Sequence, residues 1–407
     1  MPHRIAIVGG GVIGTSTAYQ LSRLAKERNL TDLDITLVEG SEIAAGASGK
    51  AGGLLALDWH GPSTASLAAL SYSLHASLAA EHSGASRWGY RQLSTISVSA
   101  DFSSLSRGST KPRGARKLKG ADEEHFDWLS KEVLTGSELL GTPETTAQVH
   151  PEQFSRAMAQ LAEERGVKIV YGTVNGLEKP SSPNEPYRLS IRARSSSDSS
   201  TPSTLEVDQV VIAAGPWTGR LLSSLGLSSG RGAGRAKAIR GSRAHSVVLR
   251  PAEGRELPAT AVFTSIKTKG GHAEPEIYNR PDGTSYACGP TDDSDLPTHA
   301  SDVVVEKSAI ASLLAHTAQL SPTHLDAQGE GGNKAKVERE QACYLPVGSG
   351  DPVIGQIEGE KTSRKGVYVA SGHSCWGICN GPGTGLVMAE LLLDGKVESA
   401  DVSDLGP

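Results

Sequence analysis

The chain has few cysteines, no long apolar run and little charge imbalance. Its 407 residues include four cysteines, which are too few for a disulfide framework and favour a reducing compartment. Every apolar run falls short of the roughly 20 residues that a membrane-spanning helix needs, so we expect no membrane span. Lys and Arg number 40 against 45 Asp and Glu, and a net charge of −5 predicts no basic surface for nucleic acid.

Signals for export and for metal binding are also missing. The N-terminal Met-Pro-His-Arg-Ile lacks the pattern of a signal peptide, and the C-terminus carries no peroxisomal tripeptide. We therefore expect a cytoplasmic protein, with peripheral association with an organelle left open. The histidines form no HExxH-like motif, and Cys375 and Cys379 have no second ligand pair, so no metal site is predicted.

Aromatic side chains are scarce, whereas glycine is abundant. Aromatic residues make up 4% of the chain, and 47 residues are glycine. The glycines do not follow the three-residue period of collagen, and most lie outside low-complexity sequence. Glycine is therefore expected where the backbone needs unusual geometry or must approach a ligand closely.

The first forty residues predict a strand, a helix and a second strand. Residues 4–8 form a short apolar run that ends at three glycines, and residues 34–38 form another. Between them, residues 12–28 carry apolar side chains at helical spacing. Two strands joined by a helix make a βαβ unit, whose strands are parallel.

A GxGxxG motif over residues 9–14 lies at the turn from the first strand to the helix. Its glycines allow a tight turn, close approach of a pyrophosphate to the backbone, and close packing of helix on strand. The helix N-terminus favours the phosphate charges, and Glu39 is placed to accept hydrogen bonds from ribose hydroxyls. The motif predicts a dinucleotide without distinguishing NAD from FAD. The predicted contacts are Gly9, Gly11, Val12, Ile13, Gly14, Glu39 and Gly40.

Three later segments are rich in glycine and small residues. They are residues 47–53, 210–218 and 371–385, and the last leads into a closing helix predicted over residues 386–393. In these segments the chain resembles the FAD-dependent D-amino acid oxidase and glycine oxidase superfamily, which includes sarcosine oxidase-like and fructosyl amino acid oxidase-like enzymes. The resemblance covers nearly the whole chain, is strongest to fungal members, and implies FAD.

The resemblance implies a place on FAD for each segment. Residues 48–53 would wrap the pyrophosphate and the flavin edge, Val174 would meet the adenine, and residues 213–215 would form a second turn beside FAD. A helix that begins at Gly383 would point its N-terminus at the flavin pyrimidine. The implied contacts are Ser48, Gly49, Lys50, Ala51, Gly52, Gly53, Val174, Ala214, Gly215, Trp217, Gly372, His373, Trp376, Gly377, Gly383 and Thr384.

The family resemblance also implies a reaction. Its members oxidise C–N bonds of amines by hydride transfer to flavin N5, and many return the electrons to O2 to give H2O2. A cation near flavin N1 assists this chemistry, and Lys50 and His373 are the catalytic candidates. The alternatives are a solvated lysine and a histidine bonded within its own loop. Trp59 is a third candidate, lining the substrate face or packing in the core.

The substrate side is expected on the strand-like segment 242–290. Tyr278 and Tyr286 flank a turn there, and Arg243 and Arg280 are cations able to bind a carboxylate bidentately. For either arginine the alternative is an ordinary surface residue. The chain shows no clear counterpart of the arginine with which the family binds a substrate carboxylate, so an amino acid substrate is left open.

Cys343 raises the question of a covalent flavin. In sarcosine oxidase-like members a cysteine in a similar stretch is bonded to the flavin, and Cys343 falls at or near that position. The alternative is a small buried residue that makes no such bond.

Together these patterns predict a mixed α/β and α+β architecture. A Rossmann-like FAD-binding domain of the glutathione reductase type would comprise residues 1–85, 150–225 and 337–400. An interleaved substrate domain, residues 86–149 and 226–336, would be built on a largely antiparallel sheet. Residues 195–204 predict a disordered hairpin tip.

The expected function is FAD-dependent oxidation of an amine or amino acid-like substrate. One alternative is a protein of the same fold that serves in binding or trafficking with little turnover. A second alternative is an NAD(P)-dependent dehydrogenase.

Overall fold

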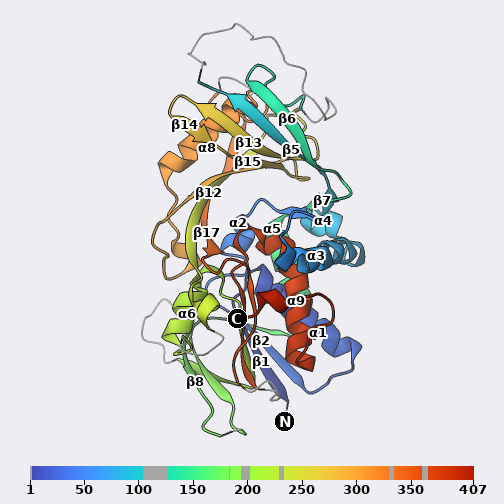
Figure 1. Cartoon of the computed structure of the whole chain (residues 1–407), viewed down its shortest axis with the longest axis vertical. Coiled ribbons are helices and arrows are strands. Elements are labelled where there is room, and N and C mark those ends of the chain that lie inside the picture. Colours follow the sequence, from blue (N-terminus) through green and yellow to red (C-terminus); the bar gives the residue numbers. More distant parts are fainter. Residues whose placement is uncertain are drawn as a thin grey trace.

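The computed structural model describes residues 2–103, 126–182, 184–193, 202–228, 233–329, 334–359 and 365–407. Within these residues, two large sheets lie at opposite ends of an elongated molecule, and both chain termini lie in the lower part (Figure 1). The mixed α/β architecture predicted from the sequence is confirmed.

The lower sheet has a parallel centre formed by β8, β2, β1, β11 and β19, with antiparallel strands at both edges. Its order across the described residues is β10-β9-β8-β2-β1-β11-β19-β18. The strands are β1 (His3–Val8), β2 (Leu33–Glu39), β8 (Lys168–Glu178), β9 (Tyr187–Ala193), β10 (Ser203–Val207), β11 (Gln209–Ile212), β18 (Val353–Glu358) and β19 (Gly366–Ser371). The predicted βαβ unit is confirmed, because β1 and β2 pair in parallel.

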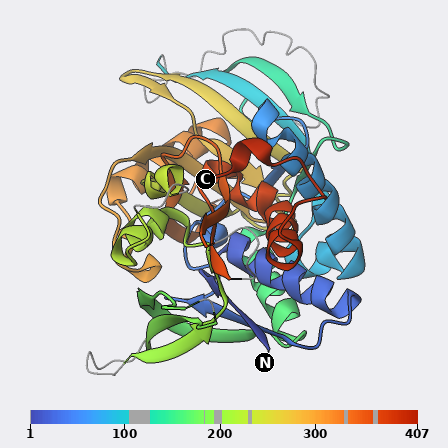
Figure 2. The same ribbon diagram turned by 60° about the horizontal axis from the view of Figure 1, so that its bottom comes forward.

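Helices cover one face of the lower sheet. The helix of the βαβ unit, α1 (Val12–Glu27), packs between α5 (Pro151–Glu163) and α9 (Gly377–Asp394). A further helix, α3 (Pro62–Glu81), packs on α9, and Figure 2 shows α9 beside α1. The apolar core between them includes Tyr19 and Phe154. The other face is covered by α6 (Thr218–Ser224) and α7 (Gly234–Lys237).

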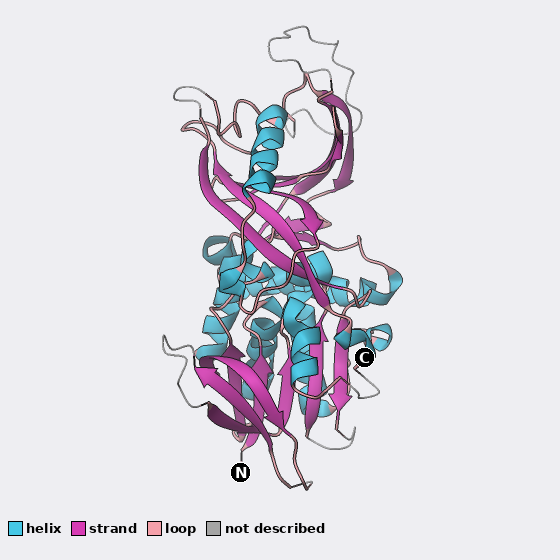
Figure 3. Ribbon diagram, turned by 90° about the vertical axis from the view of Figure 1, so that its left-hand side faces the viewer, coloured by secondary structure: helices cyan, strands magenta, loops and turns pink. Residues whose placement is uncertain are grey.

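The upper sheet is largely antiparallel. Its order across the described residues is β17-β12-β16-β15-β13-β5-β6, with the short β14 (Gly271–Ala273) paired to β13. The strands are β5 (Ser94–Asp101), β6 (Leu134–Gly141), β12 (Arg240–Arg250), β13 (Thr260–Thr268), β15 (Glu276–Asn279), β16 (Ser285–Asp292) and β17 (Lys336–Val347). Helix α8 (Lys307–Leu320) packs on one face, as Figure 3 shows, and the other face turns toward the lower unit.

Shorter elements join the two sheets. A three-stranded sheet of β3 (Leu54–Ala56), β7 (Thr146–Gln148) and β4 (Arg91–Gln92) lies between them, with α2 (Ala47–Lys50) and α4 (Gly84–Trp88) nearby. Single 3₁₀ turns occur at Gly215–Trp217, Ala300–Asp302, Ser374–Trp376 and Ser403–Leu405.

The closing helix begins earlier than the sequence predicts. Helix α9 starts at Gly377, so the prediction of a loop up to residue 385 is wrong. A Cβ at Gly383 would lie 2.4 Å from Ser71 Oγ of α3, and a Cβ at Gly385 would lie 2.5 Å from the Ser16 backbone of α1. These glycines therefore allow close helix packing rather than a helix start.

The predicted hairpin tip is only partly described. Strands β9 and β10 do form an antiparallel hairpin. Residues 195–201 lie outside the described residues. Ser203 and Thr204 pair with β9, so the prediction of disorder is wrong for these two residues.

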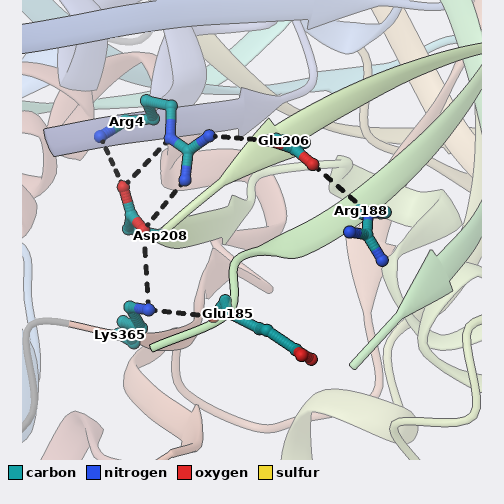
Figure 4. Close-up of polar contacts among 6 residues, drawn as sticks. All are labelled: Arg4, Glu185, Arg188, Glu206, Asp208 and Lys365. Carbon is teal, nitrogen blue, oxygen red and sulfur yellow. Dashed lines mark hydrogen bonds and ion pairs between the residues drawn. The ribbon is translucent and has the colours of Figure 1, made fainter. Parts of the chain in front are cut away.

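The amino end of the lower sheet carries a network of charged side chains, drawn in Figure 4. Asp208 accepts hydrogen bonds from the backbone N–H of Arg4, at 3.0 Å, and from its Nε, at 3.2 Å. Arg4 also pairs with Glu206 at 3.0 Å, and Lys365 Nζ lies 4.0 Å from Asp208. Burial raises the pKa of Asp208, but the bonds and charge of Arg4 outweigh it and lower the pKa overall. This network joins β1 to the segment before β11.

Candidate active site

A cavity of about 420 Å³ opens at the carboxyl ends of the parallel strands. Its walls come from the ends of β1, β2 and β19, the middle of β8 and the turn after β11. Parallel α/β sheets bind ligands at this edge because loops and helix N-termini converge there. The lining includes Val8, Gly9, Gly11, Val12, Ile13, Glu39, Gly40, Ser48, Ala51, Val174, Ala214, Gly215, Trp217, Gly372, His373 and Gly377.

One wall of the cavity is the glycine turn before α1. A Cβ at Gly14 would lie 1.8 Å from the Gly9 carbonyl oxygen, so only glycine lets α1 begin this close to β1. The Val12 N–H donates to Ser48 Oγ at 2.9 Å, which ties the turn to α2. The first N–H groups of α1 and its positive dipole end lie at this wall, as an anionic pyrophosphate requires.

Glu39 lies beside the glycine turn at the end of β2. Its carboxylate accepts hydrogen bonds from the N–H groups of Gly10 and Ser41, both at 2.6 Å. These bonds fix the carboxylate at the cavity wall. A carboxylate oxygen has more than one lone pair, so this group retains acceptor capacity for a ribose hydroxyl.

The opposite end of the cavity is formed by the segment that follows β19. His373, Ser374 and Cys375 line it, together with the first residues of α9. Because α9 begins at Gly377, its unpaired N–H groups and positive dipole end lie at this wall. The dipole role expected for a helix start at Gly383 therefore falls to Gly377 and Ile378.

Several predicted contacts lie outside the cavity wall. Gly14 and Gly383 allow close packing of helices on their neighbours. Thr384 Oγ1 and His373 Nε2 form a hydrogen bond of 3.0 Å. The predicted contacts absent from the lining are Gly14, Gly49, Lys50, Gly52, Gly53, Trp376, Gly383 and Thr384.

Other lining residues were not predicted from the sequence. They are Ala45, Gly46 and Ala47, Thr173 and Asn175 of β8, Arg220, Leu221 and Ser224 of α6, Thr298, His299 and Ala300, and Leu345 and Pro346 of β17. Thr173 and Asn175 could have been predicted, because they are the sequence neighbours of Val174, a predicted contact, and line the same part of the cavity. The contribution of residues 298–300 had no local signal.

His373 and Lys50, the two residues expected to place a positive charge beside the flavin, do not do so in the structure. His373 is buried at the cavity wall, and burial lowers its pKa to about 4, so it is neutral at neutral pH. Its Nδ1 is a buried atom without a partner among the described residues. Lys50 donates from Nζ to the Ala342 carbonyl at 2.9 Å, and burial lowers its pKa. In this geometry neither side chain presents a charge to the cavity, whereas the α9 N-terminus does.

A second group of side chains lies outside the cavity lining, and two of them contact the loop at the end of α2. Tyr278 packs so closely on the loop after α2 that a Cβ at Gly52 would lie 2.5 Å from its ring. Tyr286 donates from its hydroxyl to the Lys50 carbonyl at 2.9 Å. Trp59 packs edge-on against Phe263, with ring centroids 5.6 Å apart. We call Trp59, Phe263, Tyr278 and Tyr286, with their neighbours on β15 and β16, the aromatic wall.

The predicted substrate arginines are both engaged with protein groups. Arg243 is buried and pairs with Asp292 at 3.0 Å, and its Nη1 donates to the Val304 carbonyl at 3.2 Å. Arg280 donates to the Ala51 carbonyl at 3.1 Å and lies over the Tyr286 ring, 5.1 Å from its centroid. Arg280 therefore anchors the aromatic wall to the cavity loop, and Arg243 lies in an ion pair of the upper sheet.

Cys343 lies on β17 and is buried. It is not among the cavity-lining residues, although Leu345 of the same strand is. Burial raises the pKa of its thiol to about 11, despite the nearby charge of Lys50. The thiol is thus protonated at neutral pH.

Metal sites and membrane spans are both absent from the described residues. No group of three or more His, Cys, Asp or Glu side chains in that part of the chain is arranged to hold a metal ion. None of its helices combines the length and apolar character that crossing a membrane requires.

Relatives of known name cover the whole chain. The family model "DAO: FAD dependent oxidoreductase" matches residues 4–391. The chain is 36% identical over 421 residues to "Putative oxidoreductase C1F5.03c" of Schizosaccharomyces pombe, covering 99% of this chain and 97% of that protein. It is 27% identical over 418 residues to a glycine oxidase of Geobacillus kaustophilus, covering 96% and 94%.

Solved structures share the fold. The crystal structure of glycine oxidase from Geobacillus kaustophilus matches with a TM-score of 0.72 at 24% identity, covering 99% of this chain and 98% of that one. Iminodiacetate oxidase from Chelativorans sp. BNC1 matches with a TM-score of 0.70 at 16% identity, covering 99% of both. The chain therefore belongs to the DAO family of FAD-dependent oxidoreductases, and its cofactor is FAD.

Proposed function

We propose that this oxidoreductase oxidises the C–N bond of an amine and passes the electrons to O2. FAD held in the cavity would supply the two-electron acceptor for a hydride from the carbon next to the nitrogen. The amine becomes an imine, and O2 takes up two electrons and two protons to give H2O2. The named oxidase relatives support this reaction class, and an FAD cofactor sets aside the NAD(P)-dependent alternative.

The observation that carries the proposal is the shared loop between the cavity and the aromatic wall. Ala51 lines the cavity, and its carbonyl accepts a hydrogen bond from Arg280 of the upper sheet. The next residue, Gly52, packs on Tyr278. A small substrate held against the aromatic wall would thus lie within reach of the cavity.

The cavity residues fit the parts of FAD. The glycine turn and the α1 N-terminus would hold the pyrophosphate, Glu39 the ribose, and the backbone near Val174 the adenine. The α9 N-terminus would favour negative charge on the flavin pyrimidine, a task for which neutral His373 is unsuited. The lower unit would then be the FAD-binding domain and the upper sheet with α8 the substrate domain.

The test is a substrate panel on the purified, FAD-loaded protein. Simple amines, N-methyl amino acids, D-amino acids and glycated amino acids are added in air while H2O2 is measured. The proposal expects H2O2 and flavin reduction with at least one amine. Flavin reduction without H2O2, but with electron transfer to a dye, would contradict O2 as the acceptor.

An FAD-loaded protein that no amine of the panel reduces would contradict amine oxidation itself. Dithionite then serves as the control, because it reduces accessible flavin without using the substrate site. Reduction by dithionite but by no amine would favour the alternative of a binding protein with little turnover.

A further inference from the structure

Glu276 is a carboxylate of the aromatic wall, next to Tyr278. It is the first residue of β15, and its strand partners are Phe263 of β13 and Cys288 of β16. Side chains alternate along a strand, so Glu276 shares its face with Tyr278, whereas Ile277 points into the core under α8. The carboxylate therefore belongs to the same face as Tyr278, which contacts the loop next to the cavity at Gly52.

The partners of Glu276 are neutral. Its carboxylate accepts hydrogen bonds from the Tyr278 hydroxyl and from Cys288 Sγ, the latter at 3.7 Å. Among the described residues, no Lys, Arg or His forms an ion pair with it. Tyr278 is buried, whereas the residue Glu276 is partly exposed and can therefore be reached by a ligand.

The flavin end of the cavity lies near this carboxylate. Burial and the charge of Glu276 raise the pKa of Cys375, a residue of the cavity wall. Tyr278, which donates to Glu276, contacts the cavity loop at Gly52. A ligand that lies between Cys375 of the cavity wall and Tyr278 of the aromatic wall would therefore contact Glu276.

The nearby basic side chains do not neutralise Glu276. Lys50 is bonded to the Ala342 carbonyl, and Arg243 is paired with Asp292. Arg280 shares the face but lies four residues further along the chain, just past the end of β15 and about 13 Å away at the rise of a strand. A partly buried carboxylate without a cation is costly, and burial raises the pKa of Glu276 accordingly.

We propose that Glu276 binds the ammonium group of the substrate, which is a cationic amine recognised without a carboxylate clamp. Tyr278 and Cys288 hold the carboxylate in place, and the aromatic wall takes the apolar part of the amine. The inference rests on the proposed function and makes Glu276 the residue that selects amines over amino acid carboxylates. An ammonium group would provide the missing opposite charge and up to three N–H donors. Before hydride transfer one of its protons passes to the Glu276 carboxylate, because only the neutral amine has the lone pair that forms the imine.

The test compares three ligands of one shape and different charge. Benzylammonium, benzyl alcohol and benzoate are titrated calorimetrically into anaerobic FAD-loaded protein. The wild type should bind benzylammonium at least about tenfold more tightly than benzoate, a difference typical of a charge-assisted hydrogen bond. Tighter binding of benzoate, which Arg280 would favour, overturns the proposal, as does failure of benzylammonium to bind.

Two variants locate the effect. Glu276→Gln keeps the acceptor for Tyr278 but removes the charge, so benzylammonium should bind about tenfold more weakly while benzyl alcohol is unaffected. Glu274→Gln makes the same charge change at an exposed residue two positions earlier and should bind like the wild type. Equal benzylammonium affinity in Glu276→Gln and the wild type overturns the proposal. If Glu276→Gln does not fold, the relative affinities of the wild type for benzylammonium and benzoate still test the proposal.

Failure of this inference is distinguishable from failure of the proposed function. Amine oxidation that is unchanged in Glu276→Gln contradicts only the role of Glu276. Amine binding that depends on Glu276 but never reduces the flavin contradicts only the oxidase reaction.

Discussion

The cavity and the aromatic wall are built in different ways. The cavity is lined by several glycine-containing turns at the ends of parallel strands, and its key turn is one continuous stretch from Gly9 to Gly14. The aromatic wall is formed by side chains from β13, β15, β16 and the loop around Trp59. A cofactor site built on glycine turns is constrained by local backbone geometry, whereas a substrate wall can change by single side chains without changing the fold.

The largest effect on stability and flavin binding is expected at Gly14, where an added Cβ would have the least space. Gly14→Ala places a Cβ 1.8 Å from the Gly9 carbonyl oxygen. We expect it to lower the free energy of unfolding by about 3 kcal/mol and to abolish flavin retention, because α1 must move away from β1. Urea unfolding and the flavin absorbance of the purified protein check this.

A matched glycine provides the control. A Cβ added at Gly61 would meet no atom within 4 Å, so Gly61→Ala should retain flavin and nearly all stability. A Gly14→Ala protein as yellow and as stable as Gly61→Ala would contradict the close packing of α1 on β1.

The amino end of the lower sheet should affect stability alone. Asp208→Asn removes the charge that pairs with Arg4, and we expect a loss of about 2 kcal/mol at pH 7 with flavin content unchanged. The pKa of Asp208 is lowered in the folded state, so its contribution is present above the ordinary value of 3.8 and is lost as the pH falls through the folded pKa.

Urea unfolding of wild type and Asp208→Asn at several pH values measures this contribution. The difference between the two proteins should stay constant from pH 7 to pH 5 and shrink below pH 3.8. A difference that grows on acidification would contradict the network.

Glu276 in the aromatic wall should change stability with pH in the opposite direction to Asp208. The pKa of Glu276 is raised above its ordinary value of 4.5, mainly by burial and against the bonds of Tyr278 and Cys288. The folded state then binds more protons than the unfolded state, so stability falls as the pH rises from 4.5 to the folded pKa. Glu276→Gln should therefore be more stable than the wild type above that range, by about 1 kcal/mol.

Thermal unfolding of Glu276→Gln and Glu274→Gln across the pH range tests this sign. The groups facing Glu276 are Tyr278, Cys288 and Cys375, and burial raises the pKa of all three, so they stay neutral near pH 7. A Glu276→Gln protein that is less stable than the wild type near neutral pH would mean that the carboxylate has a structural role.

The smallest effect is expected at Cys343. Its buried, protonated thiol lies outside the cavity lining, so we expect a non-covalent flavin. Acid precipitation should release the flavin to the supernatant from both wild type and Cys343→Ala, with stability changed by about 1 kcal/mol. Flavin that stays in the wild-type pellet but not in the Cys343→Ala pellet would show a covalent bond.

The sequence predicted the cavity better than the aromatic wall. The βαβ unit and the glycine turn depend on spacing within one stretch, so residues 4–39 sufficed for them. Helix α9 was predicted too short, because glycines that suit a loop also suit close helix contacts with Ser16 and Ser71. Only the folded chain shows that these contacts exist.

The wall depends on the register between distant strands. Tyr278 and Tyr286 were predicted because they flank a turn in the strand-like segment 242–290, but Glu276 was not, although it belongs to the same strand as Tyr278. Nothing in the sequence states that Glu276 lies opposite Phe263 and Cys288, since that register arises when β13, β15 and β16 pair. The neutral state of His373 likewise follows from burial that no local pattern reveals.

The claim that cavity and wall form one site is tested most directly at Gly52. This residue lies outside the cavity lining but contacts Tyr278, so Gly52→Ala should disturb the wall and spare the cofactor. We predict that the variant retains FAD and that an amine reduces its flavin anaerobically at least about tenfold more slowly than in the wild type and in Gly61→Ala. Flavin reduction by the amine at the wild-type rate in Gly52→Ala would contradict a shared site.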